Sequence, residues 1–248
     1  MAREGNPGRH ALAAMVVVVA LFSVGCAAAA RPDQRTVQPA PMTRTPSPSP
    51  STSPIMPAFG GTIARIDDAT RARMISSWHE GCPVGLEDLR LLHLSFWDFH
   101  GRVRTGELVV HADVARDVVG VFRRLFDARF PIERMRLVDA YGGDDDRSMA
   151  ADNTSAFNCR SATGHPGVWS EHSYGRAVDI NPLRNPYVAS DGSVLPPSGT
   201  AYADRSRRDA GVIHDGDVVV RAFVRIGWEW GGLWSSFQDY QHFSSSGR

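Results

Sequence analysis

The stretch Ser170-Glu-His-Ser-Tyr-Gly-Arg-Ala-Val-Asp179 decides both the fold and the chemistry expected of this 248-residue chain. His172 offers an imidazole nitrogen and Asp179 offers a carboxylate, and both groups are ordinary zinc ligands. Gly175 permits a sharp turn between them, and the small and apolar residues at 177–180 suit a short buried strand. A turn followed by a strand can bring both ligands to one point. Taken alone, the pair is better explained as a surface histidine and a capping aspartate, because a His and an Asp seven residues apart often occur by chance.

A second stretch, Asp239-Tyr-Gln-His-Phe243, adds a third possible ligand in His242. Two histidines and one carboxylate leave a coordination position open, which is the arrangement of a catalytic zinc site rather than a structural one. Zinc in such a site lowers the pKa of a bound water towards neutrality and polarises a carbonyl group. Asp239 is our candidate for the general acid/base that removes the proton from this water and later delivers it to the leaving amine.

The two stretches together resemble the M15 metallopeptidases, with Ser-x-His-x-x-Gly-x-Ala-x-Asp followed far downstream by Asp-x-x-His-Phe. This family includes D-alanyl-D-alanine carboxypeptidases and dipeptidases, and also L-alanyl-D-glutamate endopeptidases. The resemblance implies Zn²⁺ held by His172, Asp179 and His242, with Asp239 as the catalytic acid/base, and it extends over nearly all of residues 60–248. Many carboxypeptidases of the family have Glu at the acid/base position, so the Asp here looks more like the endopeptidase branch.

The same resemblance suggests residues that bind substrate. Residues 153–160 lie where family members often carry a Ser-x-Tyr-Arg type segment, and by analogy Arg160 holds a substrate carboxylate or the developing oxyanion. A guanidinium suits this role because it stays charged and binds a carboxylate through two hydrogen bonds. The alternative is a structural ion pair between Arg160 and one of residues 144–146. Ser155 and Ser170 are further candidates for hydrogen bonds near the site, although serines at loop ends commonly cap turns.

We therefore expect a zinc-dependent peptidase that hydrolyses a peptide bond in peptidoglycan stem peptides. Removal of the terminal D-Ala is favoured by Arg160 as a carboxylate clamp, whereas cleavage inside the stem is favoured by Asp239. The rival hypothesis is a non-catalytic lipoprotein that binds cell-wall peptide on the same fold, and the intact ligands and Asp239 argue against it. The formal net charge is zero, with 27 basic and 27 acidic residues, which argues against a nucleic-acid partner.

Residues 1–30 predict export from the cytoplasm. Arginines at the start precede an apolar run over residues 11–24 and then Gly25-Cys26, which is the layout of a signal peptide. Gly25-Cys26 resembles a lipobox and would put a lipid on Cys26, although Ser23 stands where Leu is usual. A cleaved secretion signal and an uncleaved membrane anchor are the alternatives. All three place the remainder in the extracytoplasmic envelope, either secreted or attached to the membrane through the N-terminal segment.

The chain after the export segment predicts a linker and a disulfide-containing domain. Residues 31–57 are rich in Pro, Ser and Thr, which predicts a disordered linker that holds a domain at 58–248 away from the membrane. Cys82 and Cys159 fall within that domain, where an oxidising compartment allows a disulfide to persist. We expect the two cysteines to pair, and two free buried thiols are the alternative.

Residues 58–248 predict an α+β domain with a small antiparallel sheet and flanking helices, which the resemblance specifies as an M15 (hedgehog/DD-peptidase-like) domain. Apolar residues at helical spacing predict a helix over residues 113–129 with Asp113 as N-cap, and a shorter helix over 88–93. The apolar run at 217–226 fits a helix or a strand, and we favour the helix. Short strands are expected at residues 108–110, 136–140 and 177–180, with a long loop over 182–199.

Overall fold

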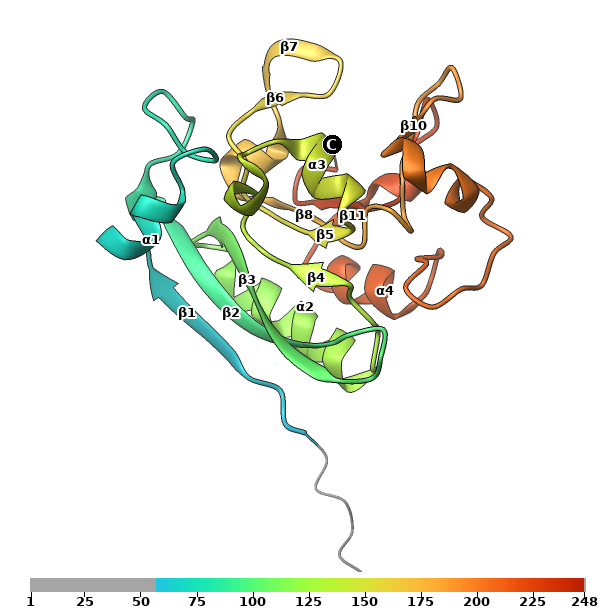
Figure 1. The fold of residues 1–248 in the computed structure, drawn as a ribbon, viewed down its shortest axis with the longest axis horizontal. Helices are drawn as coiled ribbons and strands as arrows, with labels where there is room; N and C mark the ends of the chain where they lie inside the picture. Colours follow the sequence, from blue (N-terminus) through green and yellow to red (C-terminus); the bar gives the residue numbers. More distant parts are fainter. Residues whose placement is uncertain (1–56, 248) are drawn as a thin grey trace, which may run out of the picture. The chain divides into compact units, whose positions relative to one another are not determined.

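The computed structural model describes residues 57–247 (Figure 1). The predicted export segment at residues 1–30, the lipid on Cys26 and the linker up to residue 56 lie outside the described residues. Within residues 57–247, none of the helices has the length and apolar composition that a membrane crossing requires.

The described chain is an α+β fold with short elements. The strands are β1 (Gly61–Arg65), β2 (Leu89–Trp97), β3 (Val103–His111), β4 (Arg134–Met135), β5 (Asn153–Thr154), β6 (Ser161–Ala162), β7 (His165–Trp169), β8 (Ala177–Asp179), β9 (Tyr187–Val188), β10 (Val194–Leu195), β11 (Glu229–Trp230), β12 (Gln238–Asp239) and β13 (His242–Ser244). The α-helices are α1 (Asp68–Arg73), α2 (Ala115–Asp127), α3 (Asp145–Ala150) and α4 (Val218–Val224). The 3₁₀ helices are η1 (Leu86–Asp88), η2 (Val138–Tyr141), η3 (Glu171–Tyr174), η4 (Pro197–Ala203) and η5 (Gly231–Leu233).

The largest sheet is antiparallel in the order β1-β2-β3, and both faces of β2 are covered. Helix α2 packs on one face, where Leu92 and Leu94 meet the buried side of the helix (Figure 1). Leu89 and Leu91 point to the other face and join a smaller cluster that includes Phe157. Burial on both faces explains why the leucines of β2 lie on both sides of the strand rather than on one side only.

A second antiparallel sheet, in the order β11-β13-β8, carries the chemistry. Its central strand β13 places Phe243 in the main core, stacked on Phe223 of α4 at 4.2 Å between ring centroids. Trp228 and Trp230 are buried in the same core. Because both neighbours of β13 and helix α4 pack against it, the strand has little freedom to shift its register.

Several sequence predictions are confirmed and others are wrong. The helix predicted at 113–129 is α2, the helix at 217–226 is α4 with Asp217 as its N-cap, and β8 fills the strand at 177–180. The helix predicted at 88–93 is wrong, because these residues belong mainly to strand β2, whose leucines serve both faces of the sheet.

Two further boundaries differ from the sequence predictions. Asp113 does not cap α2, since its carboxylate instead accepts hydrogen bonds from Arg176 and contacts the ring of His111. The strand predicted at 136–140 is also wrong, because β4 ends at Met135 and η2 occupies most of the segment. The predicted loop at 182–199 contains the short strands β9 and β10.

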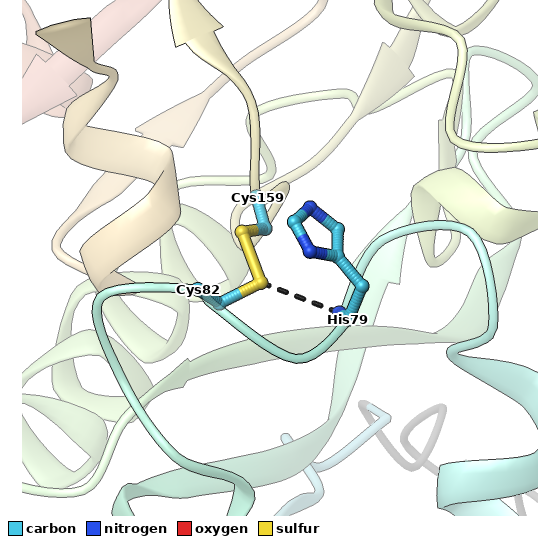
Figure 2. Close-up of side chains that lie close together, drawn as sticks. All are labelled: His79, Cys82 and Cys159. Carbon is cyan, nitrogen blue, oxygen red and sulfur yellow. Dashed lines mark hydrogen bonds between the residues drawn. A yellow bond between two sulfur atoms is a disulfide. The ribbon is translucent and has the colours of Figure 1, made fainter. Parts of the chain in front are cut away.

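Cys82 and Cys159 form a disulfide (Figure 2). The bridge joins the loop after α1 to the segment that leads into Arg160, and the Cys159 N–H also donates to the Ser77 carbonyl at 2.9 Å. The His79 backbone N–H donates to the Cys82 sulfur at 3.3 Å, as the dashed line in Figure 2 shows. The disulfide and the contact between Cys159 and Ser77 hold this loop against the smaller core cluster.

Replacing both cysteines by serine is expected to destabilise the domain by about 2–5 kcal/mol, because the bridge closes a long loop. The two cysteines are 77 residues apart, so the unfolded chain gains much freedom when the bond is absent. Urea unfolding of the wild type, with and without a reductant, and of the double variant would measure this. A wild-type midpoint that does not respond to the reductant would contradict the prediction.

Candidate metal centre

His172 is held by a tight turn whose ends are both capped. The Ser170 side chain accepts the His172 N–H at 3.3 Å, which caps η3 at its start. Gly175 ends the turn in a left-handed conformation with φ of 65°. The His172 Nδ1–H donates to the Ala156 carbonyl at 2.5 Å, so Nε2 is left as the ring's lone-pair atom. The turn therefore presents a fixed imidazole nitrogen.

Asp179 and His242 face each other across two hydrogen-bonded strands. They are direct partners in the antiparallel pairing of β8 with β13. Side chains of directly opposed residues lie on the same face with their Cβ atoms about 4.5–5.5 Å apart. The backbone of Asp179 also makes two hydrogen bonds with Ser155 on its other side, at 2.9 and 3.1 Å. Pairing on both sides holds the carboxylate in position.

The three candidate ligands converge. His172 Nε2 lies 3.1 Å from Asp179 Oδ2 and 3.2 Å from His242 Nδ1, and His242 Nδ1 lies 3.0 Å from Asp179 Oδ1. A tetrahedral zinc ion with bonds of about 2.0–2.1 Å requires ligand atoms about 3.3 Å apart, so this donor set fits zinc with little movement. A second group, His79, Cys82 and Cys159, also lies close together, but both of its sulfur atoms are in the disulfide.

The charge of the cluster also favours a cation. All three residues are buried, with exposed fractions of 3% for His172, 4% for Asp179 and 6% for His242. Burial by itself would raise the pKa of Asp179, but the two imidazoles outweigh it and lower that pKa well below its usual range. Asp179 is therefore a carboxylate at neutral pH, as a metal ligand must be.

Asp239 lies beside the cluster with a protonation state that suits proton transfer. It ends β12, pairs with Tyr187 of β9 and lines the same cleft as the three ligands. Its Oδ1 atom is buried and has no hydrogen-bond partner among residues 57–247. Burial raises the pKa of Asp239 to about 7, against the opposing effect of His242. A carboxyl group with a pKa near the operating pH is well placed to act as a general acid/base.

Arg160 lines the cleft and is also ion-paired. Its Nη2 atom lies 2.6 Å from Asp145 Oδ2, at the start of α3, and its Nη1 atom donates to the Ser161 carbonyl at 3.2 Å. The sequence left two roles open for Arg160, contact with the substrate and an ion pair with one of residues 144–146. The position of Arg160 is compatible with both. The guanidinium faces the cleft, and a carboxylate of the protein already binds it.

The two serines occupy different positions. Ser170 lines the cleft, where its hydroxyl caps the His172 turn. Ser155 does not line the cleft and contacts the site through its backbone pairing with Asp179. Its contribution in the structure is therefore to hold a ligand.

The cleft that contains these groups has a volume of about 780 Å³, within the usual range of about 300–1,000 Å³ for ligand sites. Residues of the β6–β7 hairpin, which is labelled in Figure 1, line one wall, and residues 233–237 line the other. Trp234 lies in this second wall, with its ring centroid 5.5 Å from that of His242. The wall therefore shields one ligand from solvent.

Three groups at the candidate site were not predicted from the sequence. The Ala156 carbonyl that orients His172 is a backbone group, so only the fold reveals it. Tyr187 lies in the predicted loop and reaches the cleft because β9 pairs with β12. Gln241, next to His242, is 2% exposed and lines the cleft with its Oε1 atom unpartnered among the described residues.

Gly175→Ala is expected to destabilise the protein and displace His172. An added Cβ would lie 2.6 Å from the backbone nitrogen of His111, besides the left-handed backbone cost of about 1–2 kcal/mol. Gly192→Ala is the matched control, since φ is 83° there and nothing lies within 4 Å. Urea unfolding should show a larger loss for Gly175→Ala than for Gly192→Ala. Equal losses would contradict a steric role for the close approach.

Comparison with known proteins gives one match. Residues 163–245 match the family model described as D-alanyl-D-alanine carboxypeptidase. The matched segment contains all three candidate ligands and Asp239. No curated protein and no solved structure matches the chain significantly.

Proposed function

We propose that the chain, an M15 family peptidase by its residues 163–245, hydrolyses a peptide bond in peptidoglycan stem peptides with the help of zinc. The observation that carries this proposal is the convergence of His172, Asp179 and His242 beside Asp239 in a cleft. M15 peptidases are typically zinc-dependent, and the ligand spacing found here suits that ion.

Each residue of the site has a distinct role in the proposed reaction. A zinc ion held by His172, Asp179 and His242 would supply Lewis-acid chemistry, because it would polarise the substrate carbonyl and lower the pKa of a water so that this water can lose a proton near neutral pH. Asp239 accepts a proton at its carboxylate and donates it to the nitrogen of the leaving amine. The Ala156 carbonyl keeps the His172 proton on Nδ1, away from the ligand atom. Trp234 covers His242 and limits the access of bulk water.

The cellular setting belongs to the same proposal. A disulfide and a family that acts on the cell wall suggest an extracytoplasmic protein. We further propose attachment to the membrane through the segment at residues 1–30, with a lipid on Cys26, and peptidoglycan stem peptide as the partner. Mass spectrometry of the mature N-terminus would test the lipid, since an unmodified Cys26 or a cleaved chain that lacks it excludes this attachment.

The test of activity uses the zinc-loaded protein and defined muropeptides, with products identified by mass spectrometry. We expect cleavage of one stem-peptide bond, abolished by a chelator and restored by Zn²⁺. Absence of cleavage in every stem peptide, with bound metal measured in the same sample, would reject the enzyme hypothesis. Binding of the muropeptides without cleavage would instead support the non-catalytic peptide-binding alternative.

A further inference from the structure

The ion pair between Arg160 and Asp145 lies inside the cleft rather than beneath it. Both residues line the cleft, and their side chains are 23% and 20% exposed. The Arg160 Nε atom is buried and has no hydrogen-bond partner among the described residues, while Nη2 faces Asp145 and Nη1 faces the Ser161 carbonyl. On the Nη1–Nη2 edge, which could bind a carboxylate through two hydrogen bonds, each nitrogen therefore already has a protein partner.

Among residues 57–247, no second arginine lines the cleft to take this role. Arg160 is the only arginine among the described residues that line the cleft, and the chain contains no lysine. Glu171 of η3 is a further acidic residue that lines the cleft. A substrate with a free terminal carboxylate would meet Asp145 and Glu171 as well as Arg160, so its binding is opposed by like charges.

We propose that Asp145 determines the substrate specificity of this site by holding Arg160, so that the cleft favours a bond inside a stem peptide over the bond before a terminal carboxylate. This inference rests on the proposed function and narrows it. The exposed apolar side chains on the two walls agree with it. Val168 on β7 is 59% exposed and Leu233 on the opposite wall is 64% exposed, which suits a peptide that continues beyond the metal.

The experiment compares an N-acetylated stem pentapeptide ending in D-Ala-D-Ala with its C-terminal amide. The zinc-loaded wild type should cleave an internal bond of both peptides and release little terminal residue from either. Asp145→Asn should release terminal D-Ala from the free acid, but not D-alaninamide from the amide, with a gain in kcat/KM of about tenfold or more. The gain should come mainly through a lower KM. Such a gain cannot arise from misfolding.

Two further variants isolate the cause. Asp146→Asn removes the same charge from the same helix at an exposed position outside the cleft, and it should leave the ratio of acid to amide cleavage unchanged. The double variant Asp145→Asn with Arg160→Gln should lose the gain, because the carboxylate site would be missing. An unchanged ratio in Asp145→Asn would overturn the proposal. Wild-type release of terminal D-Ala that falls in Asp145→Asn would overturn it too, since Asp145 would then orient Arg160 for the carboxylate.

A binding measurement separates failure of this inference from failure of the proposed function. Metal-free protein is titrated with N-acetyl-D-Ala-D-Ala and with its amide in a calorimeter. The wild type should show no preference for the acid, and Asp145→Asn should favour the acid by about tenfold. If no peptide is cleaved but this shift occurs, the function proposal fails and the role of Asp145 stands. Equal binding of acid and amide by both proteins would remove the role of Asp145.

Discussion

His242→Ala is expected to remove the metal and, with it, the activity. His242 is one of the three proposed protein ligands, and its Nδ1 lies within 3.2 Å of the nearest ligand atoms of the other two. Structural zinc sites with four ligands have apparent binding free energies of about 10–16 kcal/mol, or about 2.5–4 kcal/mol for each ligand. Loss of one ligand should therefore weaken zinc binding by about two to three orders of magnitude.

Zinc content after dialysis against a competing chelator measures this effect. His165→Ala is the matched control, because His165 also lines the cleft but is exposed on β7, away from the ligand cluster. The control should keep the wild-type zinc content. Stoichiometric zinc in His242→Ala under the same chelator would exclude His242 from the ligand set.

Asp239→Ala is expected to lower kcat by about 10²–10⁴-fold while zinc remains bound. The carboxyl group lies beside the ligands but is not one of the three converging groups, so its loss removes proton transfer and leaves the metal in place. Its buried Oδ1 atom makes no hydrogen bond to another described residue, so removing the carboxyl group breaks no hydrogen bond at that atom. The expected effect is therefore catalytic.

Turnover of a stem peptide and zinc content are measured on the same preparation. Asp191→Asn, at an exposed position in the β9–β10 turn, is the control for loss of one acidic charge on that part of the chain. It should behave as the wild type. Zinc lost together with activity in Asp239→Ala would make Asp239 a ligand, and full activity would show that another group transfers the proton.

The convergence of the ligands was predictable because each half of the pattern encodes its own local structure. Gly175 ends a turn and the apolar residues after it form β8, so the first stretch places His172 and Asp179 together. Strand β13 then brings His242 opposite Asp179. Neither stretch by itself predicts that β8 pairs with β13. Only the resemblance of the two stretches together to the M15 pattern suggested that they meet.

Other parts of the structure depend on partners that the sequence does not reveal. The leucines of residues 88–93 fit helical spacing as well as a strand covered on both faces, and only the presence of a second cluster behind β2 decides between them. The three consecutive acidic residues at 144–146 were all candidates for an ion pair with Arg160. The orientation of α3 selects Asp145 among them.

The opposition of Asp179 and His242 across β8 and β13 has a consequence for the stability of the whole domain. A bound ion would cross-link residues 63 positions apart, as a removable counterpart of the disulfide. Folding would then be coupled to chelation, and the thermal midpoint should rise with free Zn²⁺ as RT ln(1 + [L]/Kd) requires. A scanning calorimeter would detect the shift. The folded domain should therefore be more stable at high concentrations of free Zn²⁺. It should be more susceptible to proteolysis when a chelator removes the ion.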